Sequence, residues 1–244
     1  MALTRGALAG LLLLIAAPGL HAAQAGAPIR DNSFLIEEAY NQERNVVQHI
    51  GVLTTGSEDG WAFNVTDEWP LGGLRDQLSL GATLVEDPAG TRFGDLAVNY
   101  RRQLVGHPDA AVIVSPRITL MGVFGDSLDT GLGMEANLPV TAVLGDALVS
   151  HWNLGTVVGA GPPTVEAGAS LVWLAGPWIN FLVEGLFIGA EREGPRYLVS
   201  PGVRAALNVG ALQVVPGFAL PIDVGDRGRS EMLFYLSIEH PFGS

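Results

Sequence analysis

The residues that could perform hydrolytic chemistry lie in the run His151-Trp-Asn153. His151 and Asn153 alternate with an apolar residue, so they share one face of a predicted strand. A serine hydrolase needs a serine hydroxyl within hydrogen-bond reach of its histidine. The nearest serine, Ser150, has the opposite strand parity, and the position two residues after the histidine is an asparagine. We therefore interpret His151 as a member of an inward polar network, and we predict no catalytic residue and no enzyme.

Metal and cofactor chemistry has as little support. His49, His107 and His240 are scattered without ligand spacing, and the chain has no cysteine. The glycines of Gly131-Leu-Gly133 do not precede a helix and are not a nucleotide fingerprint. All thirteen basic residues are arginine and the net charge is −12, so a nucleic-acid partner is excluded. We expect no metal and no cofactor.

A larger set of polar residues alternates with apolar ones along the predicted strands. Its members, all assigned to the inner face, are Arg75, Asp95, Asn99, Arg101, Arg117, Glu135, Asn137, Glu166, Glu184 and Arg204. Mixed charges of this kind either line a narrow polar pathway or fill a closed interior through salt bridges, as small barrels often do. Both alternatives stay open at the level of the sequence.

The elements that position this set follow a period of two, which is the signal of β-strands. The alternation is clear in 74–84, 95–101, 132–141 and 151–158. It is weaker in 179–188, where both faces are largely apolar. Charged residues are 16% of the chain, against a usual figure of about 25%. No apolar run of the chain beyond its first residues approaches the roughly 18 that a transmembrane helix needs.

Eleven breaks rich in Gly, Pro or Asp separate the strands. They are 57–60, 70–73, 86–92, 106–110, 125–131, 144–147, 161–163, 175–177, 191–195, 209–212 and 225–229. Eleven breaks predict twelve strands, and an even number places both termini on the periplasmic side. Charged residues concentrate in the odd-numbered breaks, which that topology makes extracellular. A soluble β-barrel or sandwich, the structural alternative, has no reason to sort its charges in this way.

The last strand carries Phe234, Leu236, Ile238 and Phe242 on one face, almost at the C-terminus. An apolar outer face that ends on an aromatic residue is typical of the closing strand of an outer-membrane barrel. We interpret these four residues as the insertion signal read by the barrel-assembly machinery. The fold class is therefore all-β: a transmembrane, antiparallel, up-and-down barrel of about twelve strands in the outer membrane of a Gram-negative cell, in contact with its lipid.

The N-terminus predicts export. Arg5 precedes an apolar stretch from Ala7 to Ala17, and Ala23-Gln-Ala25 is a small-residue cleavage site. This divides the chain into a signal peptide (1–25), an N-terminal periplasmic or plug segment (26–45) and the barrel (46–244). Residues 28–44 break the strand pattern. Ser33 is a candidate helix cap, and Phe34, Glu37, Glu38 and Tyr40 are candidates for a short helical or plug segment that enters or caps the periplasmic mouth.

Three stretches carry a family resemblance. The runs Asn32-Ser-Phe-Leu-Ile-Glu-Glu-Ala-Tyr-Asn-Gln-Glu43, Val46-Val-Gln-His-Ile50 and Phe93-Gly-Asp-Leu-Ala-Val-Asn-Tyr-Arg101 resemble outer-membrane transporter-like barrels grouped with the "MetA-pathway of phenol degradation" proteins. The resemblance implies a barrel, in some members linked by name to uptake of aromatic compounds, and implies no catalytic residues. We expect a channel or transporter for a small solute. The alternatives are a non-transporting structural or sensor barrel and, more distantly, an outer-membrane lipid hydrolase.

Overall fold

A computed structural model describes most of the chain after residue 27. The described ranges are 28–57, 60–88, 90–107, 110–124, 131–159, 161–190, 194–225 and 229–242. The predicted signal peptide and most of the charged turn residues that supported the topology lie outside these ranges, so both remain predictions. Among them are Glu58, Asp59, Asp109, Asp126, Asp129, Glu191, Arg192, Glu193, Asp226 and Arg227.

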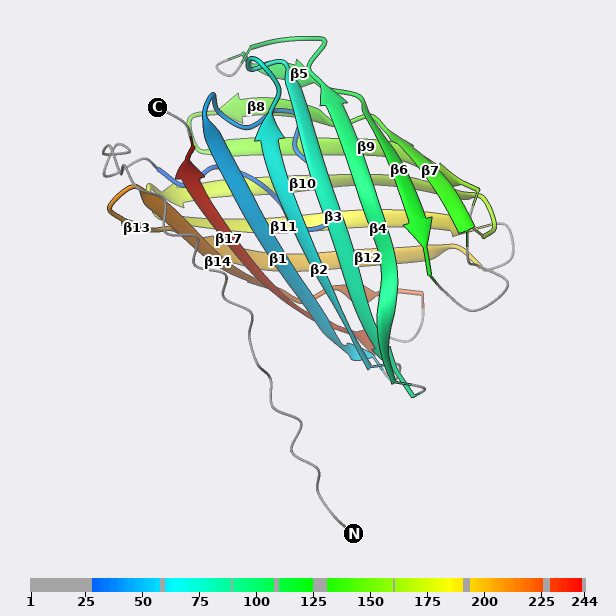
Figure 1. The fold of residues 1–244 in the computed structure, drawn as a ribbon. Helices are drawn as coiled ribbons and strands as arrows, with labels where there is room; N and C mark the ends of the chain where they lie inside the picture. Colours follow the sequence, from blue (N-terminus) through cyan, green and yellow to red (C-terminus); the bar gives the residue numbers. More distant parts are fainter. Residues whose placement is uncertain are drawn as a thin grey trace.

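Within the described residues the chain forms seventeen strand segments of one sheet. They are β1 (Val46–Ser57), β2 (Gly60–Pro70), β3 (Asp76–Asp87), β4 (Gly90–Arg102), β5 (Val112–Val114), β6 (Arg117–Val123), β7 (Gly131–Asn137), β8 (Val140–Gly145), β9 (Leu148–Val158), β10 (Thr164–Gly176), β11 (Ile179–Ala190), β12 (Arg196–Ala205), β13 (Leu207–Val209), β14 (Leu212–Ala219), β15 (Ile222–Asp223), β16 (Arg229–Ser230) and β17 (Met232–Pro241). Neighbouring segments pair antiparallel throughout, as Figure 1 shows.

The segments combine into twelve strands, as the sequence predicted. Five of the twelve are interrupted by a short break, which separates β5 from β6, β7 from β8, β12 from β13, β14 from β15 and β16 from β17. Three of these breaks contain a proline: Pro116, Pro139 and Pro221. Proline has no backbone N–H to donate to the ladder, so the pairing stops there locally. The strand β11, in the stretch where the sequence signal was weakest, spans twelve residues.

The barrel closes where β1 pairs with β17, from Val46 opposite Pro241 to Thr55 opposite Met232. Closure leaves no sheet edge, which a bilayer requires because its core offers no hydrogen bonds to unpaired backbone groups. We call the end that holds Val46 and Pro241 the periplasmic end, because single-chain bacterial barrels keep both termini there.

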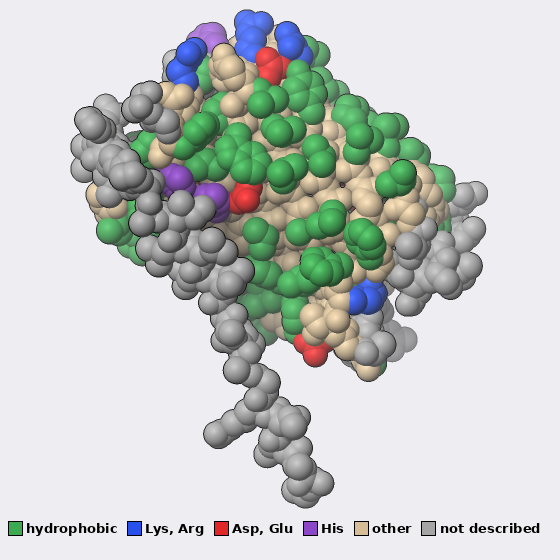
Figure 2. All heavy atoms as spheres, viewed as in Figure 1, with side chains coloured by type: hydrophobic (Ala, Val, Ile, Leu, Met, Phe, Trp, Pro, Cys, Tyr) green, Lys and Arg blue, Asp and Glu red, His purple; other side chains and the backbone are tan. Residues whose placement is uncertain are grey.

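Burial alternates along the strands with the predicted parity. On β3 the inward Gln77 and Ser79 are 1% and 5% exposed, whereas the outward Leu80 is 45% exposed. The outward set is almost entirely apolar, and Figure 2 shows hydrophobic side chains covering the visible outer face, with most charged ones toward its ends. An apolar band flanked by polar rims is the surface that a bilayer selects.

One polar chain interrupts this outer band at the closing seam. His49 Nδ1 donates to Asp67 Oδ1 at 2.6 Å, and His240 Nδ1 donates to the Pro241 carbonyl at 3.0 Å. The two Nε2 atoms lie 3.2 Å apart, and the two rings stack with centroids 5.3 Å apart. This row of side chains joins β2, β1 and β17, and its polar groups contact one another. This contact was not predicted, because the two histidines are 191 residues apart in the chain.

Residues 28–44 were predicted to be either a short helix or a plug, and the helical alternative is wrong. No helix occurs in the described part of the chain, and residues 28–45 follow a bent, extended path. Their backbone N–H groups donate to side chains of the barrel wall rather than to carbonyls four residues earlier. Wall acceptors therefore outweigh the weak local helix preference of this segment. Among the described residues no helix is long and apolar enough to cross a bilayer.

Candidate functional site

Residues 28–45, which we name the lumenal segment, lie inside the barrel at its periplasmic half. Their side chains and backbone contact inward residues of all twelve strands. In strand order the contacted residues are Gln48, Glu68, Gln77, Arg101, Arg117, Thr141, Asn153, Ser170, Glu184, Arg204, Gly217 and Tyr235. The segment therefore spans the lumen from wall to wall at this level.

Glu184 of β11 holds the middle of the segment. Its Oε1 accepts three successive backbone N–H groups, from Phe34 at 3.0 Å, Leu35 at 2.7 Å and Ile36 at 3.0 Å. Successive N–H groups that converge on one point form a concave anion site. Bonds of this kind to a charged acceptor are roughly twice as strong as neutral ones. Glu184 thus fixes the backbone of the segment rather than one of its side chains.

Arg101 of β4 holds the second half of the segment and is 2% exposed. Its guanidinium donates to Glu37 Oε1 at 2.9 Å, to the Glu38 carbonyl at 3.0 Å and to the Tyr40 carbonyl at 2.7 Å. It also donates to Asn41 Oδ1 and to Gln77 Oε1, at 2.9 and 3.0 Å. Arginine presents five donors in a fixed fork, and here all of its nitrogens are bonded to the segment or to the wall beside it.

Two further arginines extend the contact. Arg204 of β12 donates to the Asn32 carbonyl at 2.7 Å. Arg117 of β6 bridges the segment and the wall, with Nε 3.1 Å from Glu37 Oε2 and Nη2 2.5 Å from Glu135 Oε1. Opposed charges in a confined interior compensate one another's desolvation, which allows this many ionised groups inside the barrel.

Glycines in the wall make room for the apolar side chains of the segment. A Cβ added at Gly202 or Gly217 would lie 2.7 Å from the ring of Phe34, and one at Gly168 would overlap Ile36. Phe34 also packs against Tyr235, with ring centroids 5.3 Å apart. These three glycines therefore serve close approach of the segment to the wall, and not only strand curvature.

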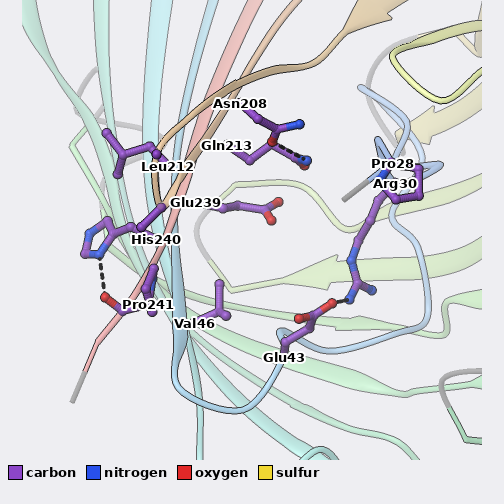
Figure 3. A pocket seen from close by; sticks show the side chains of 12 residues that line it. Pro28, Arg30, Glu43, Val46, Asn208, Leu212, Gln213, Glu239, His240 and Pro241 are labelled. Carbon is purple, nitrogen blue, oxygen red and sulfur yellow. Dashed lines mark hydrogen bonds and ion pairs between the residues drawn. The ribbon is translucent and has the colours of Figure 1, made fainter. Parts of the chain in front are cut away.

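The periplasmic mouth retains open space around the start of the segment. A cavity of about 230 Å³ lies between Arg30 and Glu43 of the segment and Gln213 and Glu239 of the wall. Figure 3 shows that Arg30 and Glu43 form an ion pair across this cavity from Glu239. A second cavity, of about 610 Å³, borders the same arginine and Tyr40. The segment is thus wetted from the periplasm while its middle is buried.

Glu38 makes the docking of the segment pH-dependent. Burial raises the pKa of its carboxyl to about 7; Glu68 and Glu37 act in the same direction, and Arg101 opposes them. Its neutral neighbour Asn32 donates to Glu38 Oε1 at 3.0 Å. The docked segment consequently binds a proton more strongly than the free segment, whose carboxyl has its ordinary pKa of 4.5. The contribution of Glu38 to docking is therefore fully present below pH 4.5, and it is lost as the pH rises from 4.5 through about 7.

We expect Glu38→Gln to remove the contribution of Glu38 to this pH dependence. At pH 8 the variant should protect the backbone amides of residues 34–42 from hydrogen exchange better than the natural chain, and at pH 4 the two should be alike. Glu231→Gln, between β16 and β17, is the matched control and should change neither. Equal protection in the natural chain and the Glu38→Gln variant at pH 8 would contradict the assignment.

The predicted inner residues are distributed as follows. Arg101, Arg117, Asn137, Glu184 and Arg204 contact the lumenal segment. Other members of the set are Asn99, which is bonded to Thr119; Glu135, which is bonded to Arg117; and Asp95 and Glu166, which are partly buried. Arg75 is exposed in the turn before β3 and does not line the lumen, because that strand begins only at Asp76.

Sequence reasoning missed the neutral residues that bind the segment. Gln77, Thr141 and Ser170 each make a hydrogen bond to it, and so does Asn153. Their inward parity was readable, but short neutral side chains in a strand carry no signal of a partner. The roles of Gly168, Gly202 and Gly217 were equally hidden. A glycine on the inward face of a strand was the only available hint.

His151 is fully buried, with Nδ1 2.9 Å from Thr141 Oγ1 and Nε2 2.9 Å from the Asp31 carbonyl. Ser150 donates its hydroxyl to the Ser170 carbonyl at 2.8 Å. Histidine and serine are thus both engaged elsewhere, and the pair does not form the nucleophile and base of a hydrolase.

No family model matches the chain, and no curated protein matches it in sequence. Solved structures do match in fold. The NanC porin is 10% identical with a TM-score of 0.56, covering 81% of this chain and 100% of that one. The KdgM porin is 9% identical with a TM-score of 0.54, over 81% and 99%. The COG4313 outer membrane channel from Pseudomonas putida F1 is 11% identical with a TM-score of 0.55, over 84% and 98%.

The chain therefore has the fold of an outer-membrane channel barrel. Its closure, its apolar outer face and the inward parity of its polar residues agree with that fold, and together they place the protein in the outer membrane, in contact with lipid.

Proposed function

We propose that this barrel conducts a small solute across the outer membrane and that the lumenal segment closes it. The observation that carries the proposal is the polar character of the seal. Hydrogen bonds and ion pairs from Glu184, Arg101 and Arg204, among others, hold the segment to the wall. Apolar contacts of Ile29 and Phe34 accompany them. When the segment leaves, water can replace the hydrogen bonds that it made to the wall. Water does not replace the contacts of a close-packed apolar core in the same way. A seal of this chemistry suits a gate that opens.

The resemblance to the "MetA-pathway of phenol degradation" group and the likeness to porins and channels support transport in general and name no solute. The excess of carboxylates over arginines favours neutral or cationic solutes over anions. We also infer export by the predicted signal peptide, and insertion by the barrel-assembly machinery through the strand that ends at Phe242.

A second candidate is a structural or sensor barrel that never opens. The number of bonds that hold the segment supports it, since a permanently filled lumen stabilises a barrel equally well. Liposome swelling separates the two. With the barrel lacking residues 28–44, neutral and cationic solutes of low mass should enter, and anions of the same size should enter more slowly. Swelling no faster than in protein-free liposomes, with a folded barrel, would favour the structural role.

A further inference from the structure

A small recess lies between the lumenal segment and the wall, on the side away from the periplasm. It has a volume of about 20 Å³ and is lined by Leu35 of the segment and by Glu135, Asn137, Glu166 and Leu186 of β7, β10 and β11, among others. A space of this size holds one water-sized group and no more. Its lining contains both apolar side chains and oxygen acceptors.

Two acceptors of the recess, Asn137 Oδ1 and the Glu166 carboxylate, lack a donor among the described residues. Asn137 is 9% exposed, and its Nδ2 donates to Glu37 Oε2 at 3.0 Å. This contact fixes the orientation of the amide, because the flipped form would place two oxygens together. Asn137 Oδ1 is then buried without a partner. Within the described residues, the Glu166 carboxylate also makes no hydrogen bond. A buried acceptor left unpaired costs about 1–3 kcal/mol, so the recess favours a ligand that donates.

The charges around the recess do not balance. Of the two carboxylates that line the recess, Glu135 pairs with Arg117, whereas Glu166 has no ion pair among the described residues. Water can donate to Asn137 Oδ1 but leaves that charge in place. A group that donates several hydrogen bonds and carries one positive charge satisfies both requirements.

We propose that this recess binds the ammonium group of a small primary amine. The ammonium group is the size of a water molecule, carries three donors and one charge, and matches Glu166, Glu135 and Asn137. The recess has no room for the rest of the amine, so the alkyl chain extends out of it past the apolar side chains of Leu35 and Leu186. A quaternary ammonium is too large and has no N–H. This proposal rests on the proposed function, because it gives the chemical class of the solute that the barrel conducts. Binding of the amine can nevertheless be measured without measuring conduction.

The test is a calorimetric titration of the purified full-length barrel in detergent with n-butylammonium chloride. Butan-1-ol and sodium butyrate, which share the alkyl chain, report partition into the micelle. Binding should be specific to the amine, and Glu166→Gln should weaken it by about tenfold, because a charge-assisted bond becomes a neutral one. Glu166→Asp should retain most of the affinity, and Glu231→Gln all of it. Glu166 makes no bond within the wall, so its variants keep the fold.

Equal heats for the amine and the alcohol, or binding that Glu166→Gln leaves unchanged, would overturn the proposal. Sodium chloride that competes fully with the amine at equal concentration would show an unselective cation site and overturn it too. These failures are separate from failure of the gate. A barrel that conducts after loss of residues 28–44 but binds no amine keeps the proposed function, whereas a barrel that binds the amine but never conducts loses it.

Discussion

Removal of residues 28–44 is expected to raise the conductance of single barrels in planar bilayers by at least about tenfold, because the lumen of a twelve-stranded barrel is wide enough to hold water once no chain fills it. In the natural chain the lumenal segment contacts residues of all twelve strands. The arginines and carboxylates left behind face water in the opened lumen, so the variant keeps its fold. Heat-modifiable migration on gels checks that it does.

The full-length chain is the control and should show small or brief currents. Current through the deletion variant should favour cations over anions, since carboxylates outnumber arginines in the chain. A folded deletion variant with the same trace as the full-length chain would refute the assignment of the segment as a gate.

The second large effect is expected from Arg101→Met. Removing one partner of a buried charged network typically costs about 3–5 kcal/mol, because the remaining charges stay desolvated and unpaired. Here Glu37 loses an ion pair at 2.9 Å, and the carbonyls of Glu38 and Tyr40 lose their donors. Denaturant unfolding in lipid, followed by tryptophan fluorescence, measures the lost free energy of unfolding.

The adjacent arginine offers a matched control. Arg102 lies on the outer face of the same strand, is half exposed and pairs with Asp76 at 2.9 Å. Solvent screens exposed ion pairs, so Arg102→Met should change stability little. The segment can also respond to Arg101→Met by leaving the lumen, in which case the loss of stability is smaller and the conductance rises. If Arg101→Met changes neither quantity more than Arg102→Met does, Arg101 does not hold the segment.

The barrel was predictable from the sequence because its signals are local. Inward and outward residues alternate within each strand, and turn residues mark each break, so the twelve strands and their faces could be derived without knowing any long-range pairing. Even the weak stretch at β11 was found as a strand, since the turns at 175–177 and 191–195 delimit it.

The lumenal segment could not be derived in the same way. Ser33, Glu37 and Glu38 suit a helix N-terminus, and the local preference is only a few tenths of a kcal/mol per residue. Three charge-assisted bonds to Glu184, which is about 150 positions away, exceed that preference. The prediction that Arg75 lines the lumen was wrong for a different reason. The alternation of inward and outward residues in β3 was correct, but it was applied to a residue that precedes the strand. Both cases reflect contacts or strand ends that no local pattern encodes.

The central claim, that residues 28–45 lie docked in the lumen, has a direct chemical test. The chain has no cysteine, and Ser33 Oγ lies 2.7 Å from Ser170 Oγ. The double variant Ser33→Cys/Ser170→Cys should form a disulfide in outer membranes, detected as a linked peptide by mass spectrometry, and single barrels should conduct only after reduction. Ser33→Cys/Ser79→Cys, with the second site on β3, is the control and should stay unlinked. Two free thiols that a maleimide labels in a folded Ser33→Cys/Ser170→Cys barrel would contradict the account.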